Sequence, residues 1–374
     1  RTGVFSIEDI MNAYLNSSNF PGRTDELASQ LSTILEADFS GSFFTTLGRW
    51  QQILADNRQK EKWPGLHDKL SILFKCGSPA VLDGPMIGIP LGIRNSDYFS
   101  DAARILGRER SHTASVEWLA RAWNMTFADT GIWMGKAFEP LSRQALAQKC
   151  GNDETTVGKY NKQATRIGRN FFREPPDPNL LQEMSIPVLT PLWDLKDRPV
   201  STDADLFGGT LTLETLEKEK NIPYSRTGSI YLGDFGRSVL RELNGKKVYQ
   251  LNYRWPGLAP VFPMTRLVDE LVQIDDGVYL GQLIYATRHY SFGSLSIPLF
   301  PDLPEIQIGE PYRPDPGPGS DEKYGYQNNG YFLMMDPTYA AEVYADDAFP
   351  QLRPRPGESG YTELGYDRPE GPAA

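Results

Sequence analysis

Two charged side chains in the later part of the chain could carry acid–base chemistry. Glu270 lies in an apolar run and alternates with Val268 and Val272. If Glu270 points inward, burial raises the pKa of its carboxyl group unless Arg254 or Arg288 pairs with it. Glu270 and Arg254 are therefore candidate catalytic residues, and a structural ion pair is the alternative explanation for a carboxylate in this place.

The histidines add a third candidate but no metal site. His67, His112 and His289 are isolated, and neither a His-x-x-x-His pair nor paired cysteines occur. Structural and catalytic zinc sites need such spacings, so we predict no metal site. A haem bound by one axial histidine stays an open alternative, with His289 as its ligand or as a catalytic residue. Glycine-rich nucleotide loops and a Gly-x-Ser-x-Gly elbow are absent too, which argues against common nucleotide enzymes and serine hydrolases.

Aromatic side chains could line a pocket for an apolar molecule. Along 249–255 every second residue is large and apolar, and the residues between them are polar. This alternation is typical of a β-strand with one face toward a core or a cavity. Tyrosine and tryptophan combine an apolar body with a polar tip, which suits a ligand pocket. The candidate ligand-binding residues are Trp133, Tyr249, Tyr253, Trp255, Tyr279 and Tyr285, and core packing explains most of them equally well.

Antiparallel strands must position these residues. The sequence predicts strands at 228–235, 249–255, 265–274, 278–290 and 325–335. Asp275-Asp276-Gly277 is a tight-turn sequence, because glycine accepts the positive φ that such turns need. We therefore expect the segments on either side of it to form a hairpin. Both arms carry apolar residues on both faces, which indicates a central position in the sheet.

Helices are expected before the strands. A cap and an apolar stripe predict a helix that begins at Ser6. An acidic first turn and an apolar stripe predict a second helix from Thr24. Further helices are expected over 43–59, 66–74, 98–106 and 113–123. Segment 82–94 is rich in glycine and proline, so we expect it to be a loop that packs on the helices.

Less regular segments follow. We interpret 141–172 as a solvated helical or irregular insertion and 186–193 as an edge strand. Segment 211–220 is expected to be a short polar helix or a strand that runs into one. The chain thus divides into a helical region at 1–125, a strand-rich region at 126–340 with an insertion near 140–180, and a tail at 341–374 that is rich in proline and acids.

A short motif suggests what kind of sheet the strands form. Gly131-Ile-Trp133-Met-Gly135 resembles the Gly-x-Trp start of the first barrel strand in lipocalin-like proteins. Glycine lets a strand approach its neighbour closely, and the tryptophan fills the end of a barrel. The resemblance covers this motif and the general strand pattern, and it implies a ligand-holding barrel built from both halves of the chain.

Composition excludes some partners. The 374 residues carry a net charge of −10 without a basic stripe, so nucleic acid is not an expected partner. No apolar run approaches the roughly 20 residues of a membrane helix, and we expect a soluble protein. Cys76 and Cys150 could form one disulfide or remain two buried thiols. The chain begins with Arg1, as an exported protein does once its leader is removed, or as a trimmed chain does. The compartment stays undetermined.

Together these patterns predict an α+β protein in which a helical N-terminal region packs against an antiparallel lipocalin-like barrel or curved sheet. The leading functional hypothesis is a binding or accessory protein for a hydrophobic small molecule held in the barrel. One alternative is an enzyme that uses an acid–base group or haem in the same cavity. Another is a structural subunit of an assembly, suggested by the proline-rich segment 311–320 and the acidic tail.

Overall fold

The computed structural model describes residues 14–22, 24–39, 43–93, 132–174, 183, 187, 189–191, 193–203, 207–261, 264–286, 291–295, 306–309, 312, 324–344 and 349. Several expected features lie outside these residues. They are the helix from Ser6, the helices at 98–106 and 113–123, the loop at 311–320, most of the tail, and the residues Gly131, Arg288 and His289.

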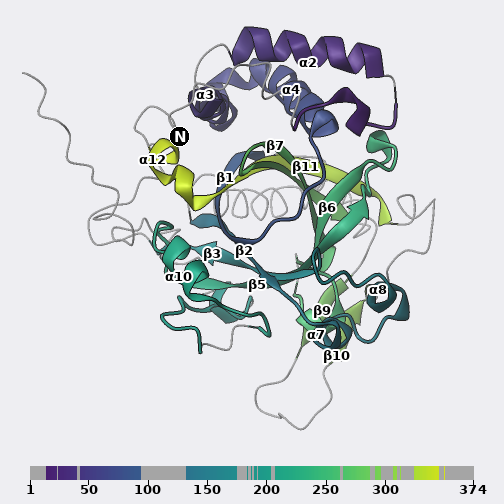
Figure 1. Cartoon of the computed structure of the whole chain (residues 1–374), viewed down its shortest axis with the longest axis vertical. Helices are drawn as coiled ribbons and strands as arrows, with labels where there is room; N and C mark the ends of the chain where they lie inside the picture. The colour runs from purple at the N-terminus through teal and green to yellow at the C-terminus, as the bar shows by residue number, and fades with distance from the viewer. Residues whose placement is uncertain are drawn as a thin grey trace, which may run out of the picture.

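Eight antiparallel strands form a closed barrel (Figure 1). They are β1 (Gly84–Ile93), β2 (Trp133–Pro140), β3 (Arg166–Phe172), β5 (Arg226–Arg237), β6 (Lys247–Asn252), β7 (Leu267–Asp275), β8 (Val278–Ala286) and β11 (Tyr326–Met335). Each strand pairs with the barrel strands before and after it in the chain, and β1 pairs with β11 to close the ring. Closure leaves no unpaired sheet edge within the barrel. The predicted α+β class and antiparallel barrel are confirmed.

Three short strands stand outside the ring. The two-residue β4 (Lys196–Asp197) pairs with the start of β5. The strands β9 (Ser291–Leu295) and β10 (Ile306–Gly309) pair with each other, and they lie below the barrel in Figure 1.

Three N-terminal helices cover one side of the barrel, at the top of Figure 1. They are α2 (Thr24–Asp38), α3 (Phe43–Ala55) and α4 (Trp63–Cys76). Thr24 is followed by Asp25 and Glu26 in the first turn, where acids favour the helix dipole. Proline stands in the first turn of α4, where its missing N–H costs nothing. The predicted helices from Thr24, at 43–59 and at 66–74 are confirmed.

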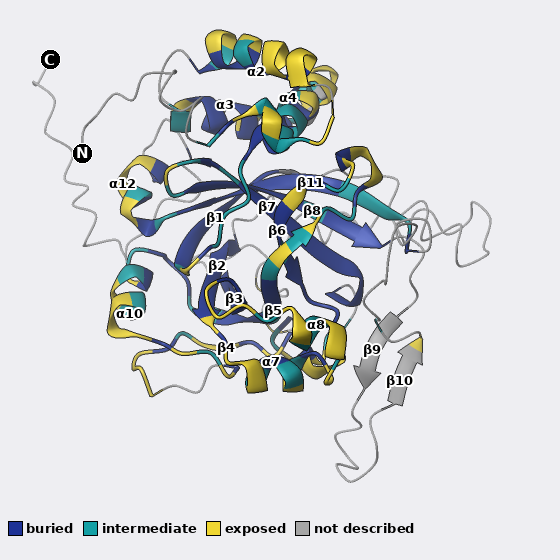
Figure 2. Ribbon diagram, turned by 45° about the vertical axis from the view of Figure 1, so that its right-hand side comes forward, coloured by how far each residue is buried: buried dark blue, intermediate teal, exposed yellow. Residues whose placement is uncertain are grey.

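Other helices are short. They are α7 (Arg143–Lys149), α8 (Glu154–Gly158), α10 (Leu213–Glu219) and α12 (Ala340–Val343), together with the 3₁₀ turns η1 (Ser17–Asn19), η2 (Asn57–Lys62), η4 (Arg241–Leu243), η5 (Pro256–Leu258), η6 (Met264–Arg266) and η7 (Pro337–Tyr339). Figure 2 shows that the helices expose one side to solvent, whereas the barrel strands are mostly buried.

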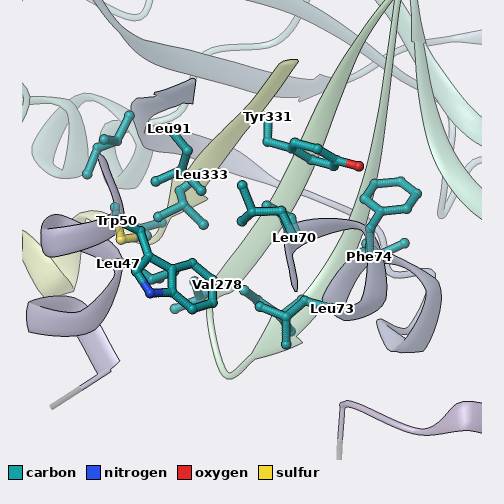
Figure 3. Close-up of a cluster of buried hydrophobic side chains, with 14 of the residues drawn as sticks. Leu47, Trp50, Leu70, Leu73, Phe74, Leu91, Val278, Tyr331 and Leu333 are labelled. Atoms are coloured by element: carbon teal, nitrogen blue, oxygen red, sulfur yellow. The ribbon is translucent and has the colours of Figure 1, made fainter. Parts of the chain in front are cut away.

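The barrel wall is apolar on both faces. One core joins the helices to the outer face of the strands, and Figure 3 shows part of it: Leu47, Trp50, Leu70, Leu73 and Phe74 of the helices meet Leu91, Val278, Tyr331 and Leu333 of the strands. Alternate residues of the same strands form a second core. Because these residues point away from the helices in a closed ring, they fill the barrel interior.

The hairpin of β7 and β8 shows how this alternation is specified. Its strands turn at Asp276 and Gly277, and Gly277 has a φ of 63° as the turn requires. In β7, Val268 and Val272 belong to the outer core and Leu267 and Leu271 to the inner one. The predicted hairpin is confirmed, as are the strands at 228–235 and 325–335 and the short helix within 211–220.

Three interpretations of the sequence are wrong. Segment 82–94 is not a loop but contains β1, which pairs with β2 and β11 in the barrel wall. Gly88 makes this possible, since a Cβ there would lie 2.5 Å from the ring of Trp133. The end of the supposed solvated insertion is the fully buried strand β3. The expected edge strand at 186–193 is helical at 187 and 189–191, where the structure describes it.

Candidate functional site

A small cavity lies inside the barrel. Its volume is about 50 Å³, and its lining comes from six of the barrel strands and the segment after β6: Pro90, Trp133, Lys136, Asn170, Tyr253, Met264, Leu267, Asp269, Leu283, Tyr331 and Phe332. Most of these residues are apolar or aromatic. The charged exceptions are Lys136 and Asp269.

Lys136 and Asp269 form a buried ion pair at this cavity. The Lys136 ammonium lies 3.1 Å from Oδ2 of Asp269, and the two side chains are 4% and 1% exposed. Nζ of Lys136 also donates to Oδ1 of Asn170 at 2.7 Å and to the hydroxyl of Tyr253 at 2.5 Å. The Tyr253 hydroxyl in turn donates to Oδ2 of Asp269 at 2.8 Å. All three ammonium hydrogens therefore have oxygen acceptors, and we call these four side chains the inner cluster.

Aromatic rings surround the ammonium. Nζ of Lys136 lies 5.2 Å from the ring centre of Tyr231, 5.3 Å from those of Trp133 and Tyr253, and 5.7 Å from that of Phe332. Ring faces attract cations, and the attraction grows where water is excluded. The indole of Trp133 also donates to Asn170 at 3.0 Å, which ties the ring to the inner cluster.

Burial acts on both charges of the pair. It lowers the pKa of Lys136, and the nearby Asp269 carboxylate opposes that effect. It raises the pKa of Asp269, and Lys136 and the Tyr253 hydroxyl oppose it. Each shift is toward the neutral form of its group, and the attraction between the two charges opposes both shifts.

The carboxylate of Asp269 is only half used. Both the ammonium and the Tyr253 hydroxyl contact Oδ2, whereas Oδ1 is buried and has no hydrogen-bond partner among the residues that the structure describes. Buried polar atoms without a partner are rare in folded proteins, because desolvation costs free energy that no bond returns. Oδ1 of Asp269 can therefore accept a further hydrogen bond.

The predicted ligand-binding aromatics divide into three groups. Trp133 and Tyr253 line the cavity. Tyr249, Tyr279 and Tyr285 belong to the inner core but not to the cavity lining, and the Tyr249 hydroxyl donates to the carbonyl of Ala164 at 2.8 Å. Trp255 lies outside this core, in a third cluster where it packs against Tyr312 at 5.0 Å.

Glu270 faces the outside of the barrel wall, one residue away from the acid of the cavity. It accepts hydrogen bonds from the Ser238 hydroxyl at 2.6 Å, the Val239 amide at 2.7 Å and the Gln282 side chain at 2.9 Å. Burial raises the pKa of Glu270, and these bonds oppose the rise. Its described partners are neutral donors rather than the arginine that a structural ion pair would require.

Arg254 also stands apart from the cavity. Its guanidinium stacks over the ring of Tyr312 at 4.1 Å and donates to the Tyr326 hydroxyl at 3.1 Å. Glu270 and Arg254 therefore do not share one site in the described residues, and His289 lies outside them.

The charged residues at the cavity were not singled out as candidates from the sequence, although each leaves a signal there. Lys136 interrupts the apolar strand that carries the Gly-x-Trp motif, and Asp269 shares its strand face with Leu267 and Leu271. The same strands also contain Glu139 and Glu270. These signals therefore point to the two strands but do not single out Lys136 and Asp269 as the pair.

A second buried ionic group, the outer cluster, lies on the outer face of the wall beside α10. Nε of Arg169 pairs with Glu139 at 3.0 Å, and its Nη2 pairs with Glu219. The Tyr224 hydroxyl donates to Glu219 as well. Within the described residues, no buried polar atom of these four side chains lacks a partner.

Some general properties complete the description. Cys76 and Cys150 are both buried and unbridged. No group of three or more metal-binding side chains gathers in the described part of the chain, and none of its helices is long and apolar enough to cross a membrane. When the chain is compared with protein-family models, curated proteins and solved structures, nothing matches it.

Proposed function

We propose that this chain is a binding or accessory protein for a small, mostly apolar molecule held inside the barrel. The observation that carries the proposal is the cavity itself, which has apolar and aromatic walls and a few converging polar groups. Ligand sites in proteins commonly have this composition. Eight-stranded barrels can hold one small ligand inside, as lipocalins do.

The barrel topology supports the lipocalin-like part of this proposal. The strands follow one another around the ring in chain order, which is the up-and-down arrangement of lipocalins. Trp133 of the Gly-x-Trp motif belongs to the inner core, as the resemblance implies. The lipocalin-like part of the proposal is based on the strand order and on the position of Trp133.

Cavity size limits the ligand. About 50 Å³ is a third of the ~150 Å³ in which an apolar cavity holds benzene. The ligand, or the part of it that enters, has only a few non-hydrogen atoms. A haem does not fit this space, so we propose no haem chemistry.

An acid–base enzyme in the same cavity is the second candidate. It is favoured by Lys136 and Asp269, because the pKa directions of both groups move them toward the neutral forms, a common condition of catalytic groups. In this version Lys136 and Asp269 take the catalytic role that the sequence analysis predicts for Glu270 and Arg254. An assembly role through the tail stays a prediction, which a mass measurement in solution tests.

The binding proposal is tested by filling the cavity. Leu283→Trp places a larger side chain in the lining, and Leu213→Trp adds the same ring at an exposed position of α10. We expect native mass spectrometry and titration with short-chain alcohols and nitriles to show binding to the wild type and to Leu213→Trp, and not to Leu283→Trp. Thermal melts establish that both variants fold. Equal binding by the two variants would place the ligand elsewhere, and no binding by the wild type would refute the proposal.

A further inference from the structure

The two oxygens of Asp269 have different environments, and this difference carries information about the ligand. Oδ2 accepts from Lys136 and Tyr253. Asp269 lines the cavity, and its Oδ1 is buried and accepts nothing from the described part of the chain. A carboxylate oxygen in a water-poor site gains strongly from any hydrogen-bond donor. A molecule bound in the cavity can supply this hydrogen-bond donor.

The charges already present determine what kind of donor fits. Lys136 balances Asp269, so the pair has no net charge. A cationic ligand would bring a second positive charge close to the ammonium, and the four rings that could stabilise it already surround Nζ. An anionic ligand would meet the Asp269 carboxylate and would find no ammonium hydrogen without an acceptor. Burying an uncompensated charge costs several kcal/mol, so a neutral ligand is favoured.

The same contacts define the role of Lys136. An amine that attacks a carbonyl group must be neutral and must present its lone pair to the substrate. Three oxygen atoms within 3.1 Å occupy the directions around Nζ. Lys136 is therefore a positioning residue, which holds the charge and the orientation of Asp269.

We propose that the cavity binds a small neutral molecule with an apolar body and one hydroxyl or N–H group, and that this group donates a hydrogen bond to Oδ1 of Asp269. The proposal rests on the proposed binding function and adds the chemical class of the ligand. The hydroxyl or N–H completes the inner cluster, and the apolar body contacts side chains such as Leu267, Leu283 and Phe332.

Two probes of equal size separate the donor from the apolar body. 1-Propanol and propionitrile have the same number of non-hydrogen atoms, but only the alcohol can donate a hydrogen bond. Binding is followed by the indole N–H resonance of Trp133, which lines the cavity and is assigned with Trp133→Phe among the 7 tryptophans. We expect 1-propanol to bind about ten- to a hundredfold more tightly, the range for a hydrogen bond to a charged group.

A pair of variants identifies the acceptor. The double variant Lys136→Met with Asp269→Leu removes both charges together, which leaves no unpaired ion to disrupt folding. We expect it to bind both probes with similar affinity. Glu270→Gln changes the neighbouring buried carboxylate on the outer face of the wall, so we expect it to keep the preference for the alcohol.

The outcomes separate this inference from the proposed function. Equal binding of both probes to the wild type overturns the ligand class and leaves apolar binding intact, as when an ordered water already fills the site at Oδ1. A preference for the alcohol that survives in the double variant overturns the role of Asp269. A Trp133 resonance that responds to neither probe refutes the proposed function as well.

Discussion

The inner and outer clusters place buried charges on opposite faces of one barrel wall. In the outer cluster a single guanidinium contacts two carboxylates, and no buried polar atom in its four side chains lacks a partner. In the inner cluster one ammonium balances one carboxylate, a cavity lies beside them, and one oxygen of Asp269 has no partner in the described ranges of the chain. Buried charges of similar exposure can thus serve different purposes. A saturated group joins parts of the fold, whereas an unsaturated group beside a cavity suits a ligand.

The largest expected effect comes from Arg169→Met. The variant leaves Glu139 and Glu219 buried without their shared cation, and breaking a buried pair costs about 3–5 kcal/mol. Burial raises the pKa of Glu139, and Arg169 opposes this rise. Without Arg169 the folded-state pKa rises further, so the loss of stability is smallest at acidic pH and grows as pH increases through that value. Urea unfolding at several pH values measures both effects.

A cost below about 1 kcal/mol would mean that the outer cluster does not hold α10 to the wall. Lys220→Met is the matched control, because Lys220 pairs with Glu217 at the exposed surface of the same region. Its expected effect is within about 0.5 kcal/mol.

Lys246 extends the comparison to a buried cation whose hydrogen-bond acceptors are backbone carbonyls. Nζ donates to Gly77 at 2.7 Å and to Asn19 at 3.1 Å, and burial lowers its pKa from 10.5 to about 8. Between these values the unfolded chain binds more protons than the folded one, so stability rises with pH across that window. The difference of about 2.5 in pKa corresponds to roughly 3 kcal/mol.

Urea unfolding of the wild type and Lys246→Met at pH values between 7 and 10.5 tests this expectation. The stability of the wild type relative to the variant should increase over this range. Buried tyrosines titrate in both proteins and cancel in the difference. A constant difference would show that Lys246 keeps its charge in the folded protein, as a carboxylate partner would make it do.

The smallest effect is expected from removing the inner pair as a unit. Lys136→Met with Asp269→Leu should change the free energy of unfolding by no more than about 1 kcal/mol, because replacing a buried ion pair by apolar side chains is often neutral or stabilising. Asp269→Leu alone should lower the free energy of unfolding by about 3 kcal/mol, because the Lys136 ammonium then stays buried without its carboxylate partner. If the double variant lost as much as the single one, the inner pair would serve the fold in the way that the outer cluster does.

The sequence allowed the fold class and the later strands to be predicted, because they depend on local signals. The hairpin of β7 and β8 has a turn sequence and alternating arms, and α2 has an acidic first turn and an apolar stripe. Such features depend on neighbours within a few residues.

Features that depend on distant contacts were missed. β1 contains five residues that are glycine or proline, a composition that favours a loop, yet β2 and β11 hold it in the barrel. β3 carries Arg169 and Asn170, which favour a solvated segment, yet partners from other strands and α10 bury both side chains. Propensity is outweighed by tertiary packing in such cases.

The prediction that Glu270 is the acid of the cavity is wrong for a related reason. Alternation along β7 separates Asp269 from Glu270, but it does not say which of them points inward. Normally the apolar face identifies the inside of a sheet. Here helices cover the outer face as well, so both faces are apolar. Only the position of α3 and α4 on the barrel decides the question, and the strand sequence does not contain it.

The pairing of β1 with β11 also governs how the protein is made. Ile87 pairs with Met335 and Ile93 with Gly330, so this seam joins two segments far apart in the chain. Bringing them together requires closing a long loop, and topologies dominated by such contacts fold slowly. During synthesis β1 and β8 keep open edges until residue 335 has left the ribosome, and open edges are sites of aggregation. The cavity itself does not exist before the seam closes, so ligand binding reports a finished barrel.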